Sequence, residues 1–533
     1  WGDDGCFCMH CRTLFGKNTG LNLLNARGKP EARIFYNRCW EEFTREMHDI
    51  IKRGNTERIF VYNGGGLHSY SSSFGRYTVS NSCEAHSALF ASERCRYLRS
   101  LGKPFEICYV TEKDWGGLLY NTQDEVRMIA TEIVAHDGTV MLATNITPQG
   151  RLLETGAGFA KDACNYVNTI KKYAKNTCAV YDIGIIWPGP EEPKVGLALM
   201  QNDLPYCYTN PSLDWSELPL VYSQSWSCSS SDTSGIKDDV DDVFMDGMIP
   251  GDLNSNMADK VRSYVKNGGI FVMELPHTGS LDGYGAKFVL EDVMGVVYDG
   301  ISSYDGHYVK ARDEGIAHGL PEDLPVLVPG NAVKIKASTA EIWAETVYPL
   351  RKLDDLHKTQ KYITNAPDGN KETTPAITVN KYGKGLGVCI ALPLSRATMG
   401  MKFGKGHPYH YWPRKLLWNT LRALLIQPLL MPASPLGVEV VINKREDGRE
   451  CYVHLFNHYG LRGVPYARES QYEPNPETVM LADVKVVLNK NRLGDLKIAK
   501  TLSGVLPEVD YRSHWIEITI PRLKQHEVLI LEQ

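Results

Sequence analysis

The chain has 533 residues, a formal net charge of −5, 43% hydrophobic residues and 23% charged residues. These values are typical of globular proteins and exclude a disordered chain or a fibrous repeat. No surplus of positive charge is present to neutralise a phosphate backbone, so nucleic acid is excluded as the main partner. No stretch of about 18 consecutive apolar residues predicts a membrane span. At roughly 100–200 residues per domain, the length predicts about three domains.

The chain opens at Trp1 with no Met, no charged leader and no apolar leader. Residues 1–11 are instead dense in the residue types that form sites. We therefore expect the chain to be a fragment that lacks an upstream part. Any export signal would lie in that part, and the segment at hand favours a cytoplasmic location.

Cys6, Cys8 and Cys11 form a C-x-C-x-x-C motif at this start. Three thiolates within six residues can wrap one Zn²⁺ ion, which prefers four ligands at about 2.3 Å. The fourth ligand could be His10, Cys39 or an upstream residue. His10 is disfavoured because it is adjacent to Cys11 in the sequence. An all-thiolate site leaves no open position, so we predict a structural zinc and no organic cofactor. The alternative is a cysteine-rich loop without metal.

Residues 1–178 alternate short strands with helices, a pattern typical of βαβ units and a parallel sheet. Four such units are half of a (β/α)₈ TIM-like barrel. An open half would expose two strand edges, which proteins avoid, so we expect the first half of the barrel to lie upstream. The predicted strands are 58–62, 77–80, 105–110 and 139–143, and the predicted helices are 85–101, 124–135 and 158–173.

Polar residues follow the carboxyl ends of these strands, where parallel α/β proteins place their chemistry. Glu84 and Glu112 are a candidate pair of catalytic carboxylates, since glycosidic hydrolysis requires two. The alternative for each is an ordinary surface glutamate. Candidate sugar-binding residues are three asparagines that suit hydrogen bonds to hydroxyls and one tryptophan that suits ring stacking or, equally, anchoring of its loop: Asn63, Asn81, Asn145 and Trp115.

Residues 179–432 show a second α/β pattern, which we interpret as a flavodoxin-like or glutamine-amidotransferase-like domain. No cysteine follows the strand that ends at Met273-Glu274-Leu275, which argues against a Cys-His nucleophilic site there. From residue 433 to 533 the elements are alternating strands with little helix, which predicts a small antiparallel β-sandwich. The predicted elements are a strand at 183–186, a turn at 247–252, a helix at 255–266, strands at 269–274 and 385–392, a helix from Pro413, and strands at 438–442, 450–457, 484–488, 515–520 and 527–531.

Several segments resemble known families. CFCMHC followed by RTLFGKNTG resembles the C-x-C-x-x-C segment of glycoside hydrolase family 42 β-galactosidases. VYNGGG, ERCRYLRSLGKPFEICYVTEKDWGG and NITPQGRL are still more similar to the hypothetical glycosyl hydrolase 6 family, whose members are α-L-fucosidase-like. GGIFVMEL and YGKGLGVCIAL resemble a β-galactosidase trimerisation-type domain, which is followed by a C-terminal β-domain. The resemblance implies a glycoside hydrolase that removes a terminal sugar such as fucose or galactose.

The resemblance also implies roles for single residues. In these relatives three such cysteines hold zinc with an upstream cysteine, and the fourth barrel strand, which would precede Trp1, carries one catalytic acid. In an α-galactosidase-like arrangement an upstream Asp is the nucleophile and Glu84 the acid/base; this arrangement is preferred. In a family-42-like arrangement the upstream residue is the acid/base and Glu112 the nucleophile. The stretch 80–86 departs from the hydrolase 6 pattern, which leaves the sugar open.

The resemblance further implies a carbohydrate substrate and a homo-oligomer, with a trimer formed through the middle domain. Because one carboxylate and half the barrel would lie upstream, we predict that the 533-residue chain alone has no glycosidase activity. The alternative from another class is a non-catalytic carbohydrate-binding or scaffold protein that keeps the glycosidase fold. An Asp or Glu at the end of the upstream fourth strand would favour the enzyme over this alternative.

Overall fold

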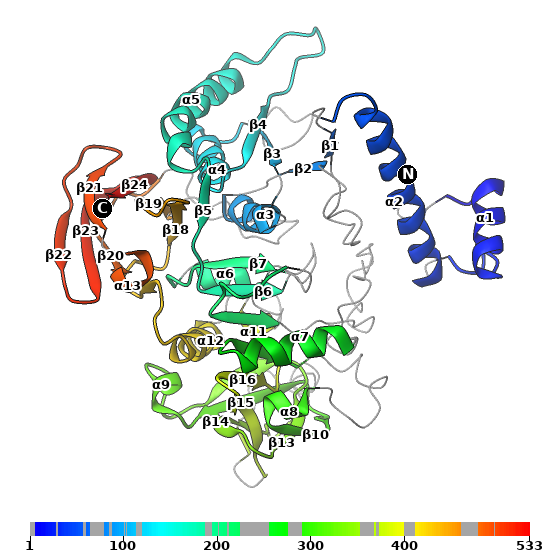
Figure 1. The fold of residues 1–533 in the computed structure, drawn as a ribbon, viewed down its shortest axis with the longest axis vertical. Helices are drawn as coiled ribbons and strands as arrows, with labels where there is room; N and C mark the ends of the chain where they lie inside the picture. The colour runs from blue at the N-terminus through cyan, green and yellow to red at the C-terminus, as the bar shows by residue number, and fades with distance from the viewer. Residues whose placement is uncertain are drawn as a thin grey trace.

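The structure is a computed structural model in which a pair of helices stands beside three sheet-bearing regions (Figure 1). None of the helices among the described residues combines the length and the apolar character required to cross a membrane. The described residues are 6–27, 30–56, 60–63, 79–84, 88–100, 102, 104–112, 120–186, 194–200, 202–209, 213–223, 255–275, 290–351, 367–368, 372–398, 411–459, 478–494 and 496–532.

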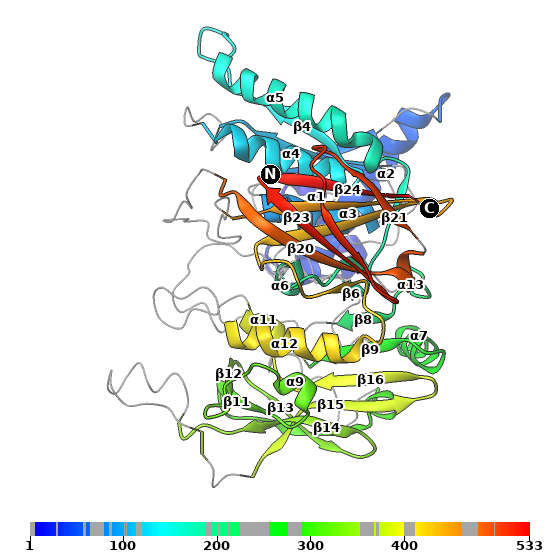
Figure 2. The same cartoon turned by 90° about the vertical axis from the view of Figure 1, so that its left-hand side faces the viewer.

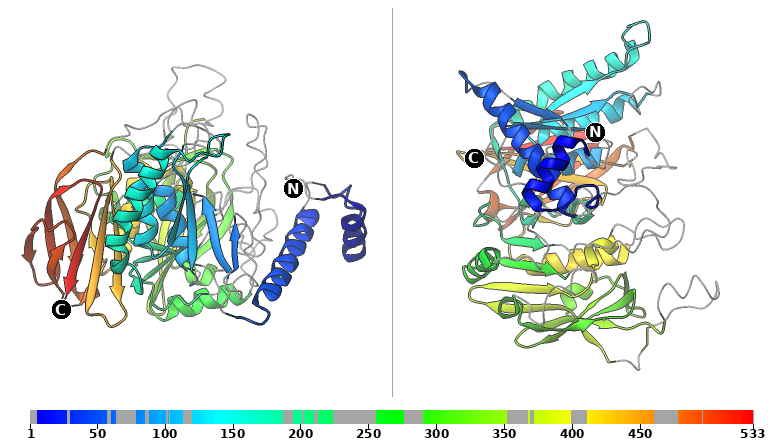
Figure 3. Two further views of the ribbon diagram at one scale, coloured as in Figure 1. Left: turned by 90° about the horizontal axis from the view of Figure 1, so that it is seen from above. Right: turned by 90° about the vertical axis from the view of Figure 1, so that its right-hand side faces the viewer.

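The helix pair consists of α1 (Met9–Thr19) and α2 (Pro30–Lys52). α1 ends where Gly20 adopts a φ of +73°, which glycine reaches without steric penalty. Apolar side chains bury one another between the helices, and the rings of Phe15 and Phe35 meet edge to face at 5.2 Å. Figure 3 shows the pair on the side of the molecule away from the C-terminal strands. The sequence analysis predicted neither helix, because charged residues dilute the apolar positions of α2.

A four-stranded parallel sheet follows, with its strands in sequence order β1-β2-β3-β4. Neighbouring strands that are also consecutive in sequence are what a (β/α)₈ barrel requires, and the half-barrel interpretation stays a prediction. The predicted strands at 105–110 and 139–143 are confirmed. The first two strands overlap the predicted ranges 58–62 and 77–80 but end later, at Asn63 and at Glu84. The strands are β1 (Phe60–Asn63), β2 (Val79–Glu84), β3 (Phe105–Val110) and β4 (Thr139–Ala143).

Three helices accompany this sheet: α3 (Ala88–Ser100), α4 (Gln123–Ala135) and α5 (Glu154–Ile170), the last continued by a 3₁₀ turn over Lys171–Tyr173. α4 begins with a capping box, in which Thr122 accepts from the Glu125 backbone and Glu125 accepts from the Thr122 backbone. α3 is buried along most of its length, charged residues included, because it packs against both the parallel sheet and the middle region.

The middle region is built on a nine-stranded mixed sheet. Its parallel strands β6, β7, β8, β9 and β16 stand in the spatial order 2-1-3-4-5, the flavodoxin-like order. The predicted strand at 183–186 and the predicted helix at 255–266 are confirmed. In sheet order the strands are β12 (Val326–Pro329), β11 (Gly306–Ala311), β14 (Glu341–Val347), β15 (Thr374–Tyr382), β16 (Gly385–Ile390), β9 (Ile270–Glu274), β8 (Leu220–Ser223), β6 (Ile183–Ile186) and β7 (Tyr206–Thr209).

Four antiparallel strands extend this sheet beyond β16, and the sequence analysis did not predict them. A separate antiparallel pair joins β10 (Val296–Ile301) to β13 (Val333–Ala337). The predicted turn at 247–252 lies outside the described residues. The helices of the region are α6 (Lys194–Met200), α7 (Ser255–Lys266), α8 (Glu291–Met294), α9 (Glu314–Ala317), α11 (Leu394–Thr398) and α12 (Tyr411–Leu424).

The C-terminal region consists of two sheets that share one apolar core, as a β-sandwich requires. Figure 2 views these sheets with α5 above them and the middle sheet below. One strand comes from far upstream: β5 (Thr177–Ala179) pairs with β18, so the predicted boundary at residue 178 falls inside a strand of the C-terminal sheet. The sheets are β17 (Leu430–Met431), β20 (Leu481–Asn489), β23 (Trp515–Leu523) and β22 (Glu508–Tyr511), and β21 (Lys497–Thr501), β24 (His526–Glu532), β19 (Glu450–Asn457), β18 (Val438–Arg445) and β5, with α13 (Lys490–Leu493) after β20.

Candidate active site at the carboxyl edge of the parallel sheet

Glu112 lies two residues beyond the end of β3, and its backbone is held in place from several sides. Thr111 continues the ladder by donating its amide to the carbonyl of Ala143 at 2.9 Å. The side-chain amide of Asn121 donates to the carbonyls of Val110, at 2.9 Å, and of Glu112, at 3.0 Å. Backbone groups left without partners where the strand ends are satisfied in this way, which fixes the direction of the Glu112 side chain.

The Glu112 carboxylate is 2% exposed and accepts three hydrogen bonds from the end of β4. Thr144 Oγ1 donates to Oε1 at 2.8 Å. The backbone amide of Asn145 donates to Oε2 at 3.1 Å, and the Asn145 side-chain amide donates to the same oxygen at 3.3 Å. All three donors are neutral, and within the described part of the chain no cation pairs with this carboxylate. The structure thus places a buried, oriented carboxylate at the carboxyl edge of the sheet.

The first turn of α5 closes over this carboxylate at Gly156. A Cβ at this position would stand 2.8 Å from Glu112 Oε1 and 2.6 Å from the hydroxyl oxygens of Thr111 and Thr144. Only glycine lets the helix approach so closely. The sequence analysis missed Thr144 and Gly156. Their signals are weak: one threonine directly after a strand, and one glycine in the first turn of a helix.

The other predicted site residues of the sheet are placed through their strands. Glu84 is the last residue of β2, and its backbone pairs with Cys108 of β3. Asn63 is the last residue of β1. The placement of Asn81 after a strand is wrong: β2 runs on to Glu84, so Asn81 lies inside the strand and pairs with the first residue of β3. Its role in sugar binding stays a prediction.

Of the predicted site residues, the structure brings Glu112 and Asn145 together. The side chains of Asn63, Asn81 and Glu84 lie outside what the structure describes. Trp115 falls in residues 113–119, which are also outside the described residues, as are the glycine triplet at 64–66 and the acidic run at 238–242.

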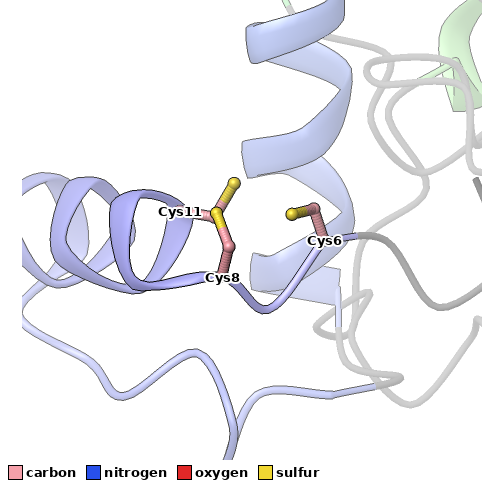
Figure 4. Close-up of side chains that lie close together, drawn as sticks. All are labelled: Cys6, Cys8 and Cys11. Atoms are coloured by element: carbon pink, nitrogen blue, oxygen red, sulfur yellow. The ribbon is translucent and has the colours of Figure 1, made fainter.

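The three N-terminal thiols converge where the chain enters α1 (Figure 4). The sulfurs of Cys6, Cys8 and Cys11 all lie within 4.8 Å of one another. Neither His10 nor Cys39 places a ligand atom that close to all three sulfurs. The structure therefore brings together three of the four ligands that zinc prefers, and the fourth is not found among the described residues.

The thiol pKa values fit a group that shares negative charge. Hydrogen bonds, chiefly from the Cys11 backbone and the neighbouring thiols, lower the pKa of Cys8 to about 7. Burial and the two nearby thiols raise the pKa of Cys11 to about 12. Full ionisation of all three sulfurs needs a cation between them, which is the chemistry of a zinc-thiolate site.

The carboxyl end of β9 holds the position at which an amidotransferase-like nucleophile was sought. Glu274 occupies it and is fully buried. Its carboxylate accepts from the backbone and hydroxyl of Ser395, at 2.9 and 2.7 Å, and from the hydroxyl of Tyr222. These contacts tie the end of β9 to the start of α11 and to Tyr222 of β8.

Comparison with known proteins gives matches among solved structures. No protein-family model and no curated protein sequence matches the chain. α-L-Fucosidase isoenzyme 2 from Paenibacillus thiaminolyticus superposes with a TM-score of 0.73 at 15% identity, over 100% of this chain and 76% of that one. The chain has the fold of a glycosidase.

Two β-galactosidases give the same result. The enzyme from Bacillus circulans sp. alkalophilus superposes with a TM-score of 0.63 at 16% identity, over 99% of this chain and 77% of that one. Gan42B, a GH42 β-galactosidase from G. stearothermophilus, superposes with a TM-score of 0.59 at 13% identity, over 99% and 76%. The resemblance to α-L-fucosidase-like proteins and family 42 β-galactosidases is thus confirmed at the level of the fold.

Proposed function

We propose that the protein is an exo-acting glycoside hydrolase whose substrate is a carbohydrate with a terminal sugar such as fucose or galactose. The observation that carries the proposal is the Glu112 carboxylate, buried and oriented at the carboxyl edge of a parallel sheet. Parallel α/β enzymes keep their catalytic groups at this edge. The solved chains with this fold are named as an α-L-fucosidase and as β-galactosidases, which supports the same reaction class.

In this proposal Glu112 is the nucleophile. Its oxygens are held by neutral donors, so no protein cation among the described residues competes with the positive charge that develops on the sugar in the transition state. The bond from the sugar carbon to the leaving oxygen breaks as the carboxylate attacks, and a second carboxyl group protonates the leaving oxygen. Water then hydrolyses the glycosyl ester. The described contacts of Glu112 support this arrangement. The alternative, in which Glu84 is the acid/base, rests on the resemblance.

In this proposal the second carboxyl group belongs to one of the further strands that would complete the barrel. Within the described residues, β1 and β4 each have a neighbour on one side alone. Large apolar side chains are exposed on β4 and in the segment after it: Met141 is 40% exposed, Ile146 64% and Leu152 55%. Four further βα units would pair with both edges, cover these side chains and close a barrel. The 533-residue chain by itself is accordingly expected to be inactive.

The test compares hydrolysis of aryl α-L-fucosides and aryl β-D-galactosides by the 533-residue chain and by the protein expressed from its complete coding sequence. We expect turnover by the latter and its loss in Glu112→Gln. The matched control is Glu154→Gln, because Glu154 lies nearby at the start of α5 and is exposed. Full activity in Glu112→Gln would overturn the assignment of the nucleophile. Sugar binding without hydrolysis of any aryl glycoside would instead support the non-catalytic alternative.

A structural zinc held by Cys6, Cys8 and Cys11 is part of the proposal, with its fourth ligand outside the described residues. The converging sulfurs and the Cys8 pKa of about 7 support it. Trimer formation through the middle region and a cytoplasmic location stay predictions. Light scattering of the protein at micromolar concentration tests the former.

A further inference from the structure

A second group of buried charged side chains lies where α3 and α4 meet the C-terminal strands (Figure 1). Glu439 of β18 is 1% exposed. Its Oε1 accepts from Ser92 Oγ at 2.5 Å and lies 2.6 Å from Arg96 Nη1, both on α3. Its Oε2 lies 2.9 Å from Nε2 of His458, the residue after β19. A single carboxylate of the C-terminal region is thereby tied to α3.

α4 brings a second carboxylate to the same histidine. Glu132 Oε1 lies 3.2 Å from His458 Nε2, and neither oxygen of Glu132 accepts a hydrogen bond from the described residues. Both side chains are buried. One imidazole N–H can make a full hydrogen bond to one carboxylate, which here is Glu439. The Glu132 carboxyl group lies against the same ring without such a bond, so burial favours its protonated, uncharged form.

His136, one turn after Glu132, completes the group. Its Nε2 lies 3.1 Å from Ser92 Oγ and 3.2 Å from Arg96 Nη1. The ligand atoms of Glu132, His136 and Glu439 are within 4.8 Å of one another, a spacing that a metal ion could use. Two cations, Arg96 and His458, already lie beside these carboxyl groups, so their burial does not require a metal.

Hydrogen bonds of Asn443 and Arg99 fasten the same junction. The side-chain amide of Asn443 donates to the Ala135 carbonyl at 2.8 Å. Arg99 donates to Asn443 Oδ1 at 2.8 Å and to the Thr177 carbonyl at 2.7 Å. No carboxyl group or imidazole takes part in these hydrogen bonds. We therefore look to the carboxylate–histidine group for the response of the junction to pH.

We propose that Glu132, His458 and Glu439 form a proton-operated lock, in which bound protons hold the C-terminal sandwich on α3 and α4 and their loss loosens that contact. Glu132 comes from α4, whereas Glu439 and His458 come from β18 and the residue after β19 in the C-terminal region. The contacts of His458 with the two carboxyl groups therefore cross the junction between regions. This inference is independent of the proposed glycosidase activity.

The pKa shifts of the three residues follow from this arrangement. Burial and the charge of Glu439 raise the pKa of Glu132 to about 8. Burial lowers the pKa of His458, but the nearby carboxyl groups of Glu132 and Glu439 outweigh this effect and raise the pKa to about 9. Burial raises the pKa of Glu439, but Arg96 and His458 outweigh it and hold the pKa below its usual range.

The groups that face these three from the other packed elements do not titrate in the same range. Burial and then Arg96 lower the pKa of His136 well below its usual value. Glu439 raises the pKa of Arg96 despite the effect of burial. The ring of Tyr206 on β7 lies 4.8 Å from the Arg96 guanidinium, and burial raises its pKa well above the usual value. Near pH 8 the changes in charge are those of Glu132 and His458.

The sign of the effect is the same for both groups. Once the junction opens, Glu132 and His458 return towards the ordinary values of 4.5 and 6.5. The closed form then binds more protons than the open form, so the stability of the junction falls as pH rises through 4.5–8 for Glu132 and 6.5–9 for His458. Each proton gives about a ten-fold rise in the opening constant per pH unit inside its window.

Hydrogen–deuterium exchange of α3 between pH 6.5 and 9.5, corrected for the intrinsic pH dependence of amide exchange, tests the lock. α3 is buried by the junction, and α7 of the middle region serves as the internal reference. We expect exchange of α3 to rise about ten-fold to hundred-fold per pH unit near pH 7–8, while α7 changes little. Equal rises in both helices would overturn the proposal.

Three variants complete the test. Glu132→Gln keeps the pair of His458 with Glu439. Below pH 8 the rise of α3 exchange should then lose the contribution of Glu132, which is about ten-fold per pH unit. The double variant Glu132→Gln with His458→Gln leaves Glu439 with Arg96, and its α3 exchange should be flat. Asp182→Asn is the control, because burial raises the pKa of this buried carboxyl to about 6 and its titration ends below the window. A double variant with the slope of the unmodified protein would overturn the lock.

Discussion

Glu112 and Glu439 are both buried carboxylates, 2% and 1% exposed, yet their partners differ in kind. Neutral hydroxyl and amide groups hold Glu112. An arginine, a histidine and a serine hold Glu439. A carboxylate paired with protein cations is already neutralised in place, whereas one held by neutral dipoles has no protein cation to compete with a substrate. The difference supports the catalytic role proposed for Glu112 and a role in cohesion for Glu439.

Their positions in the fold explain the difference. Glu112 lies at a strand end, where the backbone of β4 and the first turn of α5 supply N–H and O–H groups. Glu439 lies inside β18 and faces α3, whose buried length carries Arg96. Burying a charge between two regions requires a partner on the other side, and the helix supplies it.

The largest expected effect is on catalysis by Glu112→Ala in the protein expressed from its complete coding sequence. Removal of the nucleophile should lower kcat by about 10³-fold or more. Added azide can then attack the sugar in place of the carboxylate and give a glycosyl azide. The anomeric configuration of this product, read by NMR, should be opposite to that of the substrate. An azide of retained configuration would make Glu112 the acid/base instead.

Glu439→Gln should act on stability. It leaves Arg96 and His458 buried with Glu132 as their remaining carboxylate, and breaking a buried pair costs about 3–5 kcal/mol. Urea unfolding followed by circular dichroism measures the loss. The matched control is Glu517→Gln, which removes a more exposed pair with Lys485 and should change stability by less than about 1 kcal/mol. Equal losses in the two variants would contradict the structural role of Glu439.

The sequence predicted those parts of the fold that depend on local pattern. The apolar runs of β3, β4 and β6 and the amphipathic α7 were found with correct bounds. The ends of β3 and β4 followed from these runs, which is why both Glu112 and Asn145 were among the candidate site residues. The contact between them comes from the structure. β2 was misplaced because its residues, VSNSCE, are polar and carry little strand signal, and this moved Asn81 to the wrong place in the strand.

The junction at Glu439 could not be predicted in this way. Glu132 and His136 are one helical turn apart and visible as a pair, but their partner lies on β18, and Ser92 and Glu439 are 347 positions apart in the chain. No local period reports such a contact. The antiparallel strands beyond β16 were missed for a similar reason, since their burial comes from neighbours in the sheet and not from strict alternation within each strand.

The three thiols of Cys6, Cys8 and Cys11 are a third kind of anionic group. No protein cation among the described residues lies between their sulfurs. We expect Cys8→Ser to remove bound zinc and to lower the thermal midpoint by about 5 °C. The pH optimum of the enzyme should not change, because the proposed zinc has a structural role and takes no part in the reaction. Elemental analysis and scanning calorimetry measure both effects. Less than about 0.2 zinc per chain in the unmodified protein would mean that the thiols form a loop without metal.

The smallest expected effect is on kcat, when the orientation of the Glu112 carboxylate is loosened but the carboxylate itself is kept. Thr144→Val keeps the side-chain shape but removes the donor that lies 2.8 Å from Oε1, while the Asn145 donors remain. The carboxylate keeps its charge and loses one constraint on its direction, so kcat should fall by about ten-fold, with KM nearly unchanged. Thr147→Val is the matched control, because the Thr147 hydroxyl serves a surface turn by accepting from the Arg151 amide at 3.2 Å. If both variants keep full kcat, the hydroxyl of Thr144 does not orient a nucleophile. Glu112 would then be a structural carboxylate, as Glu439 is.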